Sequence, residues 1–222
     1  MRIDIITLFP EMFAPLNESI IKRAQENKIL EIGFTQLRDY AFDKHKQVDD
    51  TPFGGGSGMV LKPEPMFRAV RSILQNALPE EQRRILIMDP IGETFSQNKA
   101  KELAKYEQLI FICGHYEGFD ERIYELADEA ISIGEYVLTG GELPAMVIID
   151  AVARMLPGVL GSEESAKTDS FYDGGIGYPQ YTKPRDFEGR VVPEILLSGH
   201  HAKIEQWRQE QSLLRKKSNK FS

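Results

Sequence analysis

The sequence is poor in cysteine and in long apolar runs, and both shortages exclude classes of protein. Cys113 is the single cysteine among 222 residues, so it cannot form an internal disulfide bond and cannot by itself make a zinc site. The longest apolar runs, 109–113 and 145–149, are five residues each, whereas a membrane-spanning helix needs about twenty. The sequence therefore predicts no membrane span, and the place of Cys113 in an apolar run favours a buried, unreactive thiol over a nucleophile.

Basic residues are in the minority, with 27 Lys and Arg against 34 Asp and Glu, which gives a net charge of −7. This balance argues against indiscriminate binding to nucleic acid. The segment 199–222 is an exception, because it carries six Lys or Arg and two Glu, so its net charge is +4 and that of the remainder is −11. Two interpretations stay open for it: a solvated helix end whose cations suit the helix dipole, which composition alone favours, and an RNA contact.

The N-terminus does not resemble a signal peptide, because Asp4 interrupts its apolar residues and no small-residue cleavage site follows. We therefore expect a cytoplasmic protein, which agrees with the single cysteine. Hydrophobic residues make up 41% and charged residues 27% of the chain, as in ordinary globular proteins. A chain of this length can bury a core without a disulfide or a metal ion to stabilise it.

Strand and helix patterns alternate over the first two thirds of the chain, which is typical of an α/β fold with a mostly parallel sheet and helices on both faces. Short apolar stretches predict strands at 2–9, 31–37, 84–88, 108–113 and 129–133. Helical patterns of apolar residues predict helices at 13–24, 66–77, 98–105 and 144–156, the third with Ser96 near its start.

Two segments interrupt this alternation. The first, 43–58, is too rich in glycine to hold a helix or a strand, and the second, about 157–184, is long enough to be a linker or a functional loop. Beyond it, helices at 192–198 and 201–217 are expected, the latter with Ile204, Trp207 and Leu214 on one face. The chain is therefore predicted to have three parts: a domain over 1–160, a flexible interdomain linker over 161–184 and a small helical domain over 185–222.

Glycine-bearing loops follow three of the predicted strands, at 89–92, 114–118 and 134–141. Ligands bind at the carboxyl edge of an open α/β sheet, so these loops predict a cofactor site, although ordinary turns at strand ends also use glycine. The sequence has neither a Walker phosphate loop nor a dinucleotide fingerprint after its first strand. The loops carry Glu117 and Glu135 but no Lys or Arg, which suits a ligand without phosphates, such as an adenosine-containing cation.

Candidate catalytic residues are weak when each is judged alone. Asp169 lies in the long connection, where an aspartate is usually a turn residue. His200 and His201 are adjacent, so in a helix their side chains diverge and cannot bind one metal ion together. Arg154 stands near the end of an apolar helix, where a cation must reach solvent or find a partner. Residue type alone selects none of them.

Long, irregular motifs, among them Thr168-Asp169-Ser170-Phe171, follow one another over nearly the whole chain. They occupy the segments 6–13, 38–40, 52–60, 113–122, 134–145, 157–161, 168–171, 178–182 and 196–207. In these motifs the chain resembles the bacterial tRNA (guanine-N1)-methyltransferase family, whose members are knotted methyltransferases of the SPOUT class.

The resemblance implies methyl transfer from S-adenosylmethionine to N1 of the guanosine at tRNA position 37, immediately 3′ of the anticodon. It implies a homodimer with active sites at the subunit interface, and a deep trefoil knot at the cofactor site of the domain 1–160, which the rule against threaded loops would not predict. The linker 161–184 becomes a lid, and 185–222 becomes a tRNA-binding domain. The residues implied to bind S-adenosylmethionine are Pro90, Gly114, Tyr116, Glu117, Gly118, Ile133, Gly134, Glu135, Tyr136, Val137, Leu138, Gly140, Gly141 and Pro144.

By the same resemblance, Asp169 is the general base that takes the N1 proton, and Arg154 stabilises the negative charge that moves onto O6 of the guanine. An unperturbed aspartate, with a pKa of about 3.9, is a weak base for this proton, so such stabilisation is needed. Substrate contacts are expected from Lys183, Arg185 and Asp50, with His45 and Asp49 as further candidates near Asp50. Magnesium is a suggested requirement of the family, without a protein-ligated site here.

Two positions depart from the family pattern. Ile91 stands where glutamine is expected in the first loop. Lys183 stands where arginine is common, and lysine keeps the positive charge but cannot make the paired hydrogen bonds of a guanidinium group. Two rival functions are a knotted methyltransferase acting on a ribose hydroxyl or another base, and an RNA-binding protein without catalysis. The presence of both Asp169 and Arg154 argues against each of them.

Overall fold

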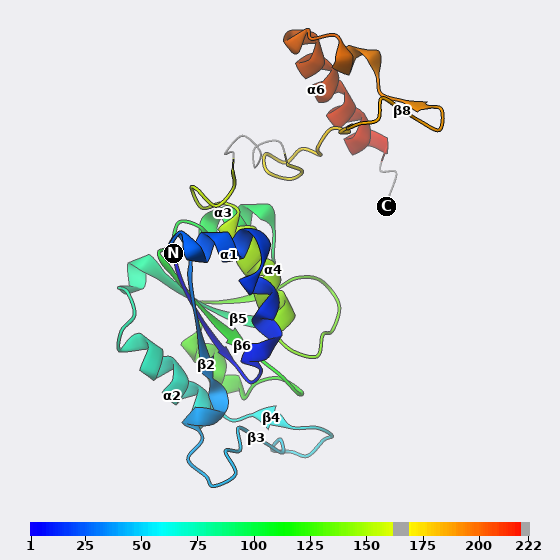
Figure 1. Cartoon of the computed structure of the whole chain (residues 1–222). Helices are drawn as coiled ribbons and strands as arrows, with labels where there is room; N and C mark the ends of the chain where they lie inside the picture. The colour runs from blue at the N-terminus through cyan, green and yellow to red at the C-terminus, as the bar shows by residue number, and fades with distance from the viewer. Residues whose placement is uncertain (162–168, 219–222) are drawn as a thin grey trace. The chain divides into compact units, whose positions relative to one another are not determined.

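The computed structural model describes residues 1–161 and 169–218, and the chain divides into two compact units, Met1–Gly161 and Ser162–Ser222 (Figure 1). Of the expected linker over 161–184, residues 162–168 lie outside the described residues, including Thr168 of the motif quoted above, and residues 169–184 belong to the second unit.

The first unit is built on a parallel sheet of five strands in the order β2-β1-β6-β5-β7. The strands are β1 (Arg2–Thr7), β2 (Glu31–Gln36), β5 (Arg83–Thr94), β6 (Gln108–Cys113) and β7 (Glu129–Ser132). All five predicted strands are confirmed. β6 has the predicted bounds, because all of its residues are buried and all but the first, Gln108, are apolar.

Helices cover both faces of this sheet, as Figure 1 shows. Along β6, Leu109, Phe111 and Cys113 join one core cluster, while Ile110 and Ile112 join the other, because successive side chains of a strand point to opposite faces. The first cluster packs under α1, α3 and α4, and the second under α2. Their bounds are α1 (Ser19–Glu26), α2 (Pro63–Leu74), α3 (Gln97–Leu103) and α4 (Glu142–Ala153). The expected α/β fold is confirmed in this unit.

The predicted helix over 13–24 is in fact two elements. A 3₁₀ helix, η1 (Pro10–Asn17), contains Pro15, and α1 begins only after Glu18, whose backbone is extended. Proline lacks the backbone N–H that a continuous α-helix would need at this point. The predicted helix near 98–105 is confirmed as α3, with the Ser96 hydroxyl accepting a hydrogen bond from the Lys99 N–H at 3.3 Å as the N-cap.

The segment 43–58 corrects one expectation, because it does hold a short strand. β3 (Asp49–Asp50) pairs in antiparallel fashion with β4 (Val60–Leu61). The glycines lie in the loop between the two strands, where Gly54 and Gly55 take φ values of +86° and +80° that other residues rarely adopt. The glycine run therefore shapes the connection of a hairpin, and the strands take the residues on either side of it.

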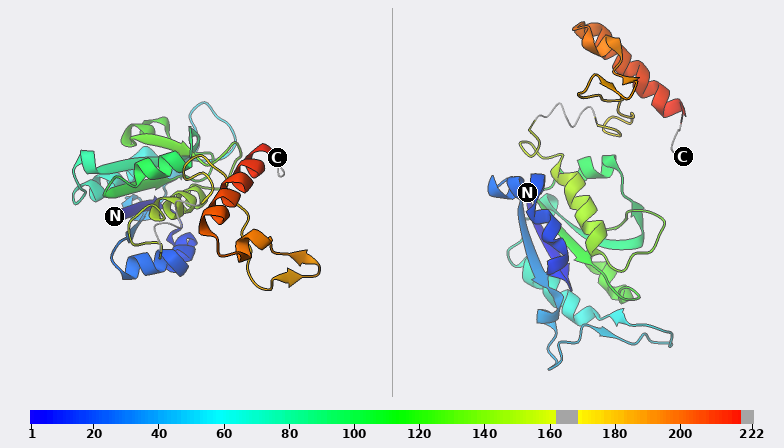
Figure 2. Two further views of the ribbon diagram at one scale, coloured as in Figure 1. Left: turned by 90° about the horizontal axis from the view of Figure 1, so that it is seen from above. Right: turned by 45° about the vertical axis from the view of Figure 1, so that its right-hand side comes forward.

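The second unit contains a hairpin and two helical segments, drawn in orange and red in Figure 2. The hairpin joins β8 (Asp186–Phe187) to β9 (Arg190–Val191), and it was not predicted. The predicted helices are present as the 3₁₀ helix η5 (Glu194–Leu197) and as α6 (His201–Ser218). Of the three apolar residues predicted on one face of α6, Ile204 and Trp207 are half-buried, and the Leu214 side chain is 57% exposed. Nowhere in residues 1–161 or 169–218 is a helix long and apolar enough to cross a bilayer.

Candidate active site

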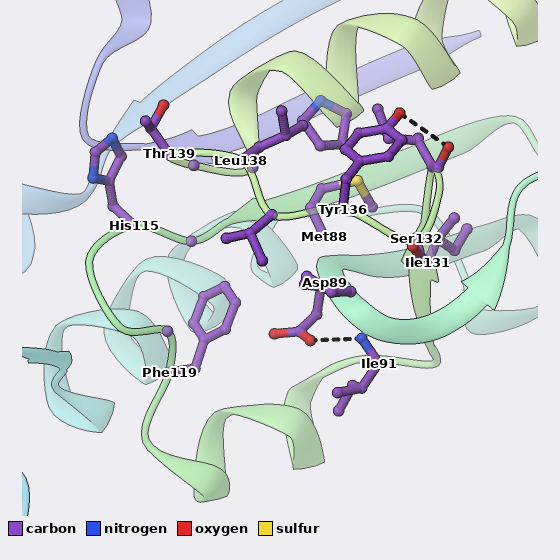
Figure 3. A pocket seen from close by; sticks show the side chains of 18 of the residues that line it. Met88, Asp89, Ile91, His115, Phe119, Ile131, Ser132, Tyr136, Leu138 and Thr139 are labelled. Carbon is purple, nitrogen blue, oxygen red and sulfur yellow. Dashed lines mark hydrogen bonds between the residues drawn. The ribbon is translucent and has the colours of Figure 1, made fainter.

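A cavity of about 340 Å³ opens at the carboxyl edge of the sheet, where the loop 89–92 within β5 meets the loops after β6 and β7 (Figure 3). Its size falls in the range of small-molecule sites, and its place is where open α/β sheets bind ligands. Glu135 is exposed and does not line the cavity, although it was expected at the cofactor site. The other predicted cofactor residues all line it: Pro90, Gly114, Tyr116, Glu117, Gly118, Ile133, Gly134, Tyr136, Val137, Leu138, Gly140, Gly141 and Pro144.

The second and third loops are held against each other by their backbones. The Gly141 N–H donates to the Gly114 carbonyl oxygen at 2.9 Å, and His115 and Gly140 form an isolated antiparallel bridge. A Cβ atom at Gly141 would lie 2.8 Å from the Cα of Cys113, so only glycine permits this approach. The glycines that sequence analysis noted at strand ends therefore bring two loops into contact.

The first loop, residues 89–92, bulges out of β5. Met88 on one side of it and Glu93 on the other both pair with Ile131 of β7, so the register shifts across the loop. A Cβ atom at Gly92 would lie 2.3 Å from the backbone carbon of Ala130, which requires glycine there as well. The predicted strand ended at Met88 because Asp89 and Pro90 read as a turn, whereas β5 resumes after the bulge.

Sequence analysis did not identify two residues that shape this loop. One oxygen of the Asp89 carboxylate accepts a hydrogen bond from the Ile91 N–H at 3.0 Å, and the other accepts one from the Tyr124 hydroxyl at 2.6 Å. Tyr124 lies in the 3₁₀ helix η4 (Glu121–Leu126), 35 residues further along the chain. The aspartate directly before the loop was the one available signal, and nothing in the sequence indicated its partner.

The chemistry of the cavity wall fits an adenosine-containing cation. Apolar side chains such as Ile131, Leu138 and Pro144 offer surfaces for a planar base, and the glycine loops expose backbone donors and acceptors. The carboxylates of Asp89 and Glu117 line the same cavity. Among the described residues of this lining there is no Lys or Arg, so the wall favours positive charge over phosphate.

Behind the cavity, two buried groups join the start of α4 to the core. The Thr7 hydroxyl donates to Glu142 Oε1 at 2.8 Å, and Glu142 is 1% exposed. No described residue forms a hydrogen bond with Glu142 Oε2, which is also buried. Burial raises the pKa of the Cys113 thiol well above its usual value, and the Glu142 carboxylate raises it further. The expectation that Cys113 is buried is confirmed, and its low reactivity stays a prediction.

The two predicted catalytic residues lie in different units. Arg154 is the half-buried C-cap residue of α4 in the first unit, and its backbone N–H donates to the Asp150 carbonyl oxygen at 3.2 Å. Asp169 is the first described residue of the second unit, and it is exposed. The catalytic pairing of these two residues therefore stays a prediction.

The chain directly after Asp169 forms a closed loop. The Phe171 N–H donates to the Gly175 carbonyl oxygen at 2.7 Å, and the Gly177 N–H donates to the Ser170 hydroxyl at 2.8 Å. We call residues 169–177 the Asp169 loop. Its internal hydrogen bonds give the candidate base a defined backbone within the second unit.

Three side chains of α6 bind the Asp169 loop. The Ser212 hydroxyl donates to the Ile176 carbonyl oxygen, Arg215 donates to that of Gly177 at 3.0 Å, and Lys216 donates to that of Gly174 at 3.1 Å. Residues 212, 215 and 216 share one helix face, because they are three and four positions apart. Two cations of the basic segment, Arg215 and Lys216, thus bind carbonyl oxygens of the protein itself. Neither of the two interpretations of this segment had predicted that contact.

Four of the five predicted substrate contacts are exposed, and the fifth, Asp49, is half-buried. Asp50 lies in β3 of the first unit, where its carboxylate accepts a hydrogen bond from the Thr51 N–H at 2.8 Å, and His45 is exposed in the same unit. Lys183 and Arg185 are exposed in the second unit, on either side of Pro184. The structure therefore leaves all four side chains accessible to a large ligand, without assigning one to them.

Comparison with known proteins shows the family to which the chain belongs. The sequence profile of the family described as tRNA (Guanine-1)-methyltransferase TrmD matches residues 1–222. A protein named tRNA (guanine-N(1)-)-methyltransferase from Desulfitobacterium hafniense (strain Y51) is 57% identical over 215 residues, which cover 97% of this chain and 81% of the relative. Proteins of the same name from Desulforamulus reducens and Staphylococcus aureus (strain JH9) are 59% and 58% identical. Each match covers 97% of this chain, and 85% and 87% of the two relatives, respectively. The chain therefore belongs to the tRNA (guanine-1)-methyltransferase TrmD family.

Proposed function

We propose that the protein methylates N1 of a guanosine in tRNA, with S-adenosylmethionine as the donor and the guanosine at position 37, immediately 3′ of the anticodon, as the acceptor. The identity of the donor is supported by the cavity at the sheet edge, whose apolar side chains and two carboxylates fit an adenosine-containing cation. Family membership supports the acceptor. Because tRNA is the acceptor, the reaction would take place in the cytoplasm.

S-adenosylmethionine supplies an electrophilic methyl group on a positively charged sulfur. For the methyl carbon to bond to N1, the N1–H bond must break, and Asp169 accepts that proton. The electron pair of the N1–H bond leaves negative charge on N1 and O6, and the Arg154 guanidinium stabilises it at O6. With the donor held by the loops that line the cavity, its C–S bond would break as the N–C bond forms, and a neutral thioether and methylated guanosine would leave the site.

We further propose that two copies of the chain form each active site. Leu143 and Val147 of α4 are apolar, yet their side chains are 45% and 49% exposed. Leu143 and Val147 are four positions apart and therefore share a face, and Arg154 lies a further seven positions along the same helix. We propose that a partner subunit covers this face, and that Asp169 of one copy acts with Arg154 of the other at one guanine.

The domain roles follow from the same proposal. Residues 1–160 form the catalytic domain, whose cavity loops are proposed to be knotted. Residues 161–184 act as the lid and 185–222 as the tRNA-binding domain. Exposed Lys183 and Arg185 suit phosphate contacts. The Arg208 guanidinium, 4.8 Å from the ring centroid of Tyr178, and exposed Tyr181 suit stacking with unpaired bases.

The test is methyl transfer from labelled S-adenosylmethionine to two unmodified tRNA transcripts that differ only in guanosine or adenosine 3′ of the anticodon. Transfer to the guanosine transcript alone, mapped to N1, is expected. Transfer to a ribose hydroxyl or another base would establish the first rival function. Donor and tRNA binding without transfer would establish the second.

Asp169→Asn provides the control for the proposed base. We expect this variant to bind the donor as wild type does and to lose at least about a hundredfold in kcat, the contribution typical of general base catalysis. Equal rates for the variant and wild type would remove Asp169 from its role without affecting the assignment of donor and acceptor.

A further inference from the structure

The loop 89–92 lacks the polar side chain that the family pattern predicts at its centre. Ile91 occupies that position, and its side chain is 76% exposed at the rim of the cavity. Pro90 beside it has no N–H to donate. The ladder with β7 holds only the two ends of the loop, through Met88 and Glu93. The centre of the loop therefore needs another source of support.

The Asp89 carboxylate supplies that support from inside the loop. Its Oδ1 accepts the Ile91 N–H at 3.0 Å, which is the pattern of an Asx turn (Figure 3). Its Oδ2 points the other way and accepts the Tyr124 hydroxyl at 2.6 Å, a short hydrogen bond of the kind that a charged acceptor makes. The Tyr124 hydroxyl thereby fixes the rotation of the carboxylate, which in turn fixes the Ile91 amide.

Tyr124 also connects this loop to the second cavity loop. Its ring meets that of Phe119 edge-on, with centroids 5.9 Å apart. The Phe119 ring fills the space beside Gly114, where a Cβ atom would lie 2.5 Å from Phe119 Cζ. Burial and the neighbouring Asp89 carboxylate raise the pKa of Tyr124 above its ordinary value, so the hydroxyl keeps its proton and remains a donor. Both Asp89 and Phe119 line the cavity.

We propose that Tyr124 is a positioning residue of the donor site: its hydrogen bond to Asp89 holds the loop 89–92 in the shape that binds S-adenosylmethionine. This inference rests on the proposed function for the identity of the ligand. It adds Tyr124, which lies outside the glycine loops, and its partner Asp89 to the residues that shape the site. Tyr124 does not line the cavity and acts through Asp89, which does.

The test compares Tyr124→Phe, Asp89→Ala and the double variant by calorimetric titration with S-adenosylmethionine. Tyr124→Phe keeps the ring against Phe119 and removes only the hydroxyl. We expect it to raise the dissociation constant about tenfold, the effect of losing one hydrogen bond to a charged group. Asp89→Ala should raise it at least as much. The double variant should be no worse than Asp89→Ala alone, because the hydroxyl acts only through the carboxylate.

Two further readouts separate positioning from general stability. Tyr124→Phe should raise the KM for the donor while leaving the KM for tRNA and kcat within about twofold of wild type. In the protein without ligand, it should also increase hydrogen exchange at the Ile91 amide. Tyr106→Phe is the matched control, because Tyr106 precedes β6 and therefore lies at the amino edge of the sheet, away from the cavity. This variant should change neither the KM for the donor nor hydrogen exchange at the Ile91 amide.

The outcomes distinguish this inference from the proposed function. If wild type binds no S-adenosylmethionine, the proposed function and the inference fall together. If wild type binds the donor and Tyr124→Phe binds it equally well, the inference falls and the proposed function stands. Additive losses in the double variant would also overturn it, because they would show that Tyr124 acts independently of Asp89.

Discussion

Thr7, at the end of β1, donates a hydrogen bond from its hydroxyl to Glu142 Oε1 at 2.8 Å, although the two residues are 135 positions apart in the chain. Both side chains are buried, and the same hydroxyl accepts the Phe9 N–H at 3.0 Å. This hydroxyl is therefore a link between the first strand, the turn after it and the helix that closes the cavity.

Replacement of Thr7 by valine should lower the free energy of unfolding by about 2 to 3 kcal/mol. The substitution keeps the shape of the side chain but leaves a buried carboxylate oxygen and a backbone N–H without their partner. Urea unfolding measures the change. Thr94→Val, at an exposed position of β5, is the control and should change the free energy of unfolding by less than about 0.5 kcal/mol. Equal stability of Thr7→Val and wild type would show that the buried link contributes nothing.

The α6 residues that bind the Asp169 loop should affect turnover more than tRNA affinity. In Arg215→Met, the hydrogen bond to the Gly177 carbonyl is lost and the loop carrying the proposed base is less well held. We expect kcat to fall roughly fivefold to tenfold, with little change in the salt dependence of tRNA binding.

Lys217→Gln is the matched control for this prediction, because Lys217 is an exposed cation in the same turn of α6. Its loss should leave kcat unchanged and reduce the salt dependence if the tail contacts phosphates. Should Arg215→Met reduce the salt dependence as Lys217→Gln does, with kcat intact, Arg215 would be a phosphate contact and not a support of the loop.

The Cys113 thiol should resist modification in the folded protein. Burial and the Glu142 carboxylate raise its pKa, so at about pH 8 the reactive thiolate is scarcer than for a free cysteine. Labelling with an aromatic disulfide reagent should be more than about a hundredfold slower in buffer than in denaturing urea, where one thiol per chain should react. Rapid labelling of the folded protein would mean that the cavity wall opens readily.

The ion pair between Asp120 and Arg122 should make a small contribution to stability that disappears in acid. Paired hydrogen bonds from the Arg122 guanidinium, both at 2.7 Å, lower the pKa of Asp120 in the folded protein. A lowered pKa means that the stabilisation is complete above the unfolded pKa of about 3.9 and is lost as the pH falls through the folded value.

Asp120→Asn should therefore reduce the free energy of unfolding at pH 7 and have no effect once the pH is well below that of the folded pKa. Because the Arg122 side chain is 62% exposed, the difference should be below about 1 kcal/mol. Urea unfolding across this pH range measures it. Arg122→Gln should reproduce the same pH dependence, and a difference that persists in acid would exclude the ion pair as its cause.

The sequence predicted most clearly what local pattern controls. The apolar run of β6 had the right bounds because both faces of that strand are covered, and Ser96 marked the start of α3 through its own hydrogen bond. The three glycine loops were predicted to share one edge of the sheet, and they line one cavity, since parallel strands end on the same side.

What sequence reasoning could not supply depends on residues that meet only in the folded chain. Neither Asp89 nor Tyr124 has a sequence pattern that indicates the other, because 35 residues separate them and Tyr124 lies in a 3₁₀ helix. The same holds for Arg215 and Lys216, which read as tail cations until α6 and the Asp169 loop are seen together. The hairpin β8–β9 is only two residues long in each strand, too short for an alternating pattern.

The pairing of both ends of the loop 89–92 with Ile131 has a consequence for the thermodynamics of ligand binding. Because the residues at both ends of this loop pair with one residue of the sheet, the loop has few conformations to lose when a ligand binds. Association should then be a single step without a slow closing phase at this loop, and the configurational entropy lost there should be small. If the overall reaction includes a slow ordering step, we expect that step to accompany the binding of tRNA.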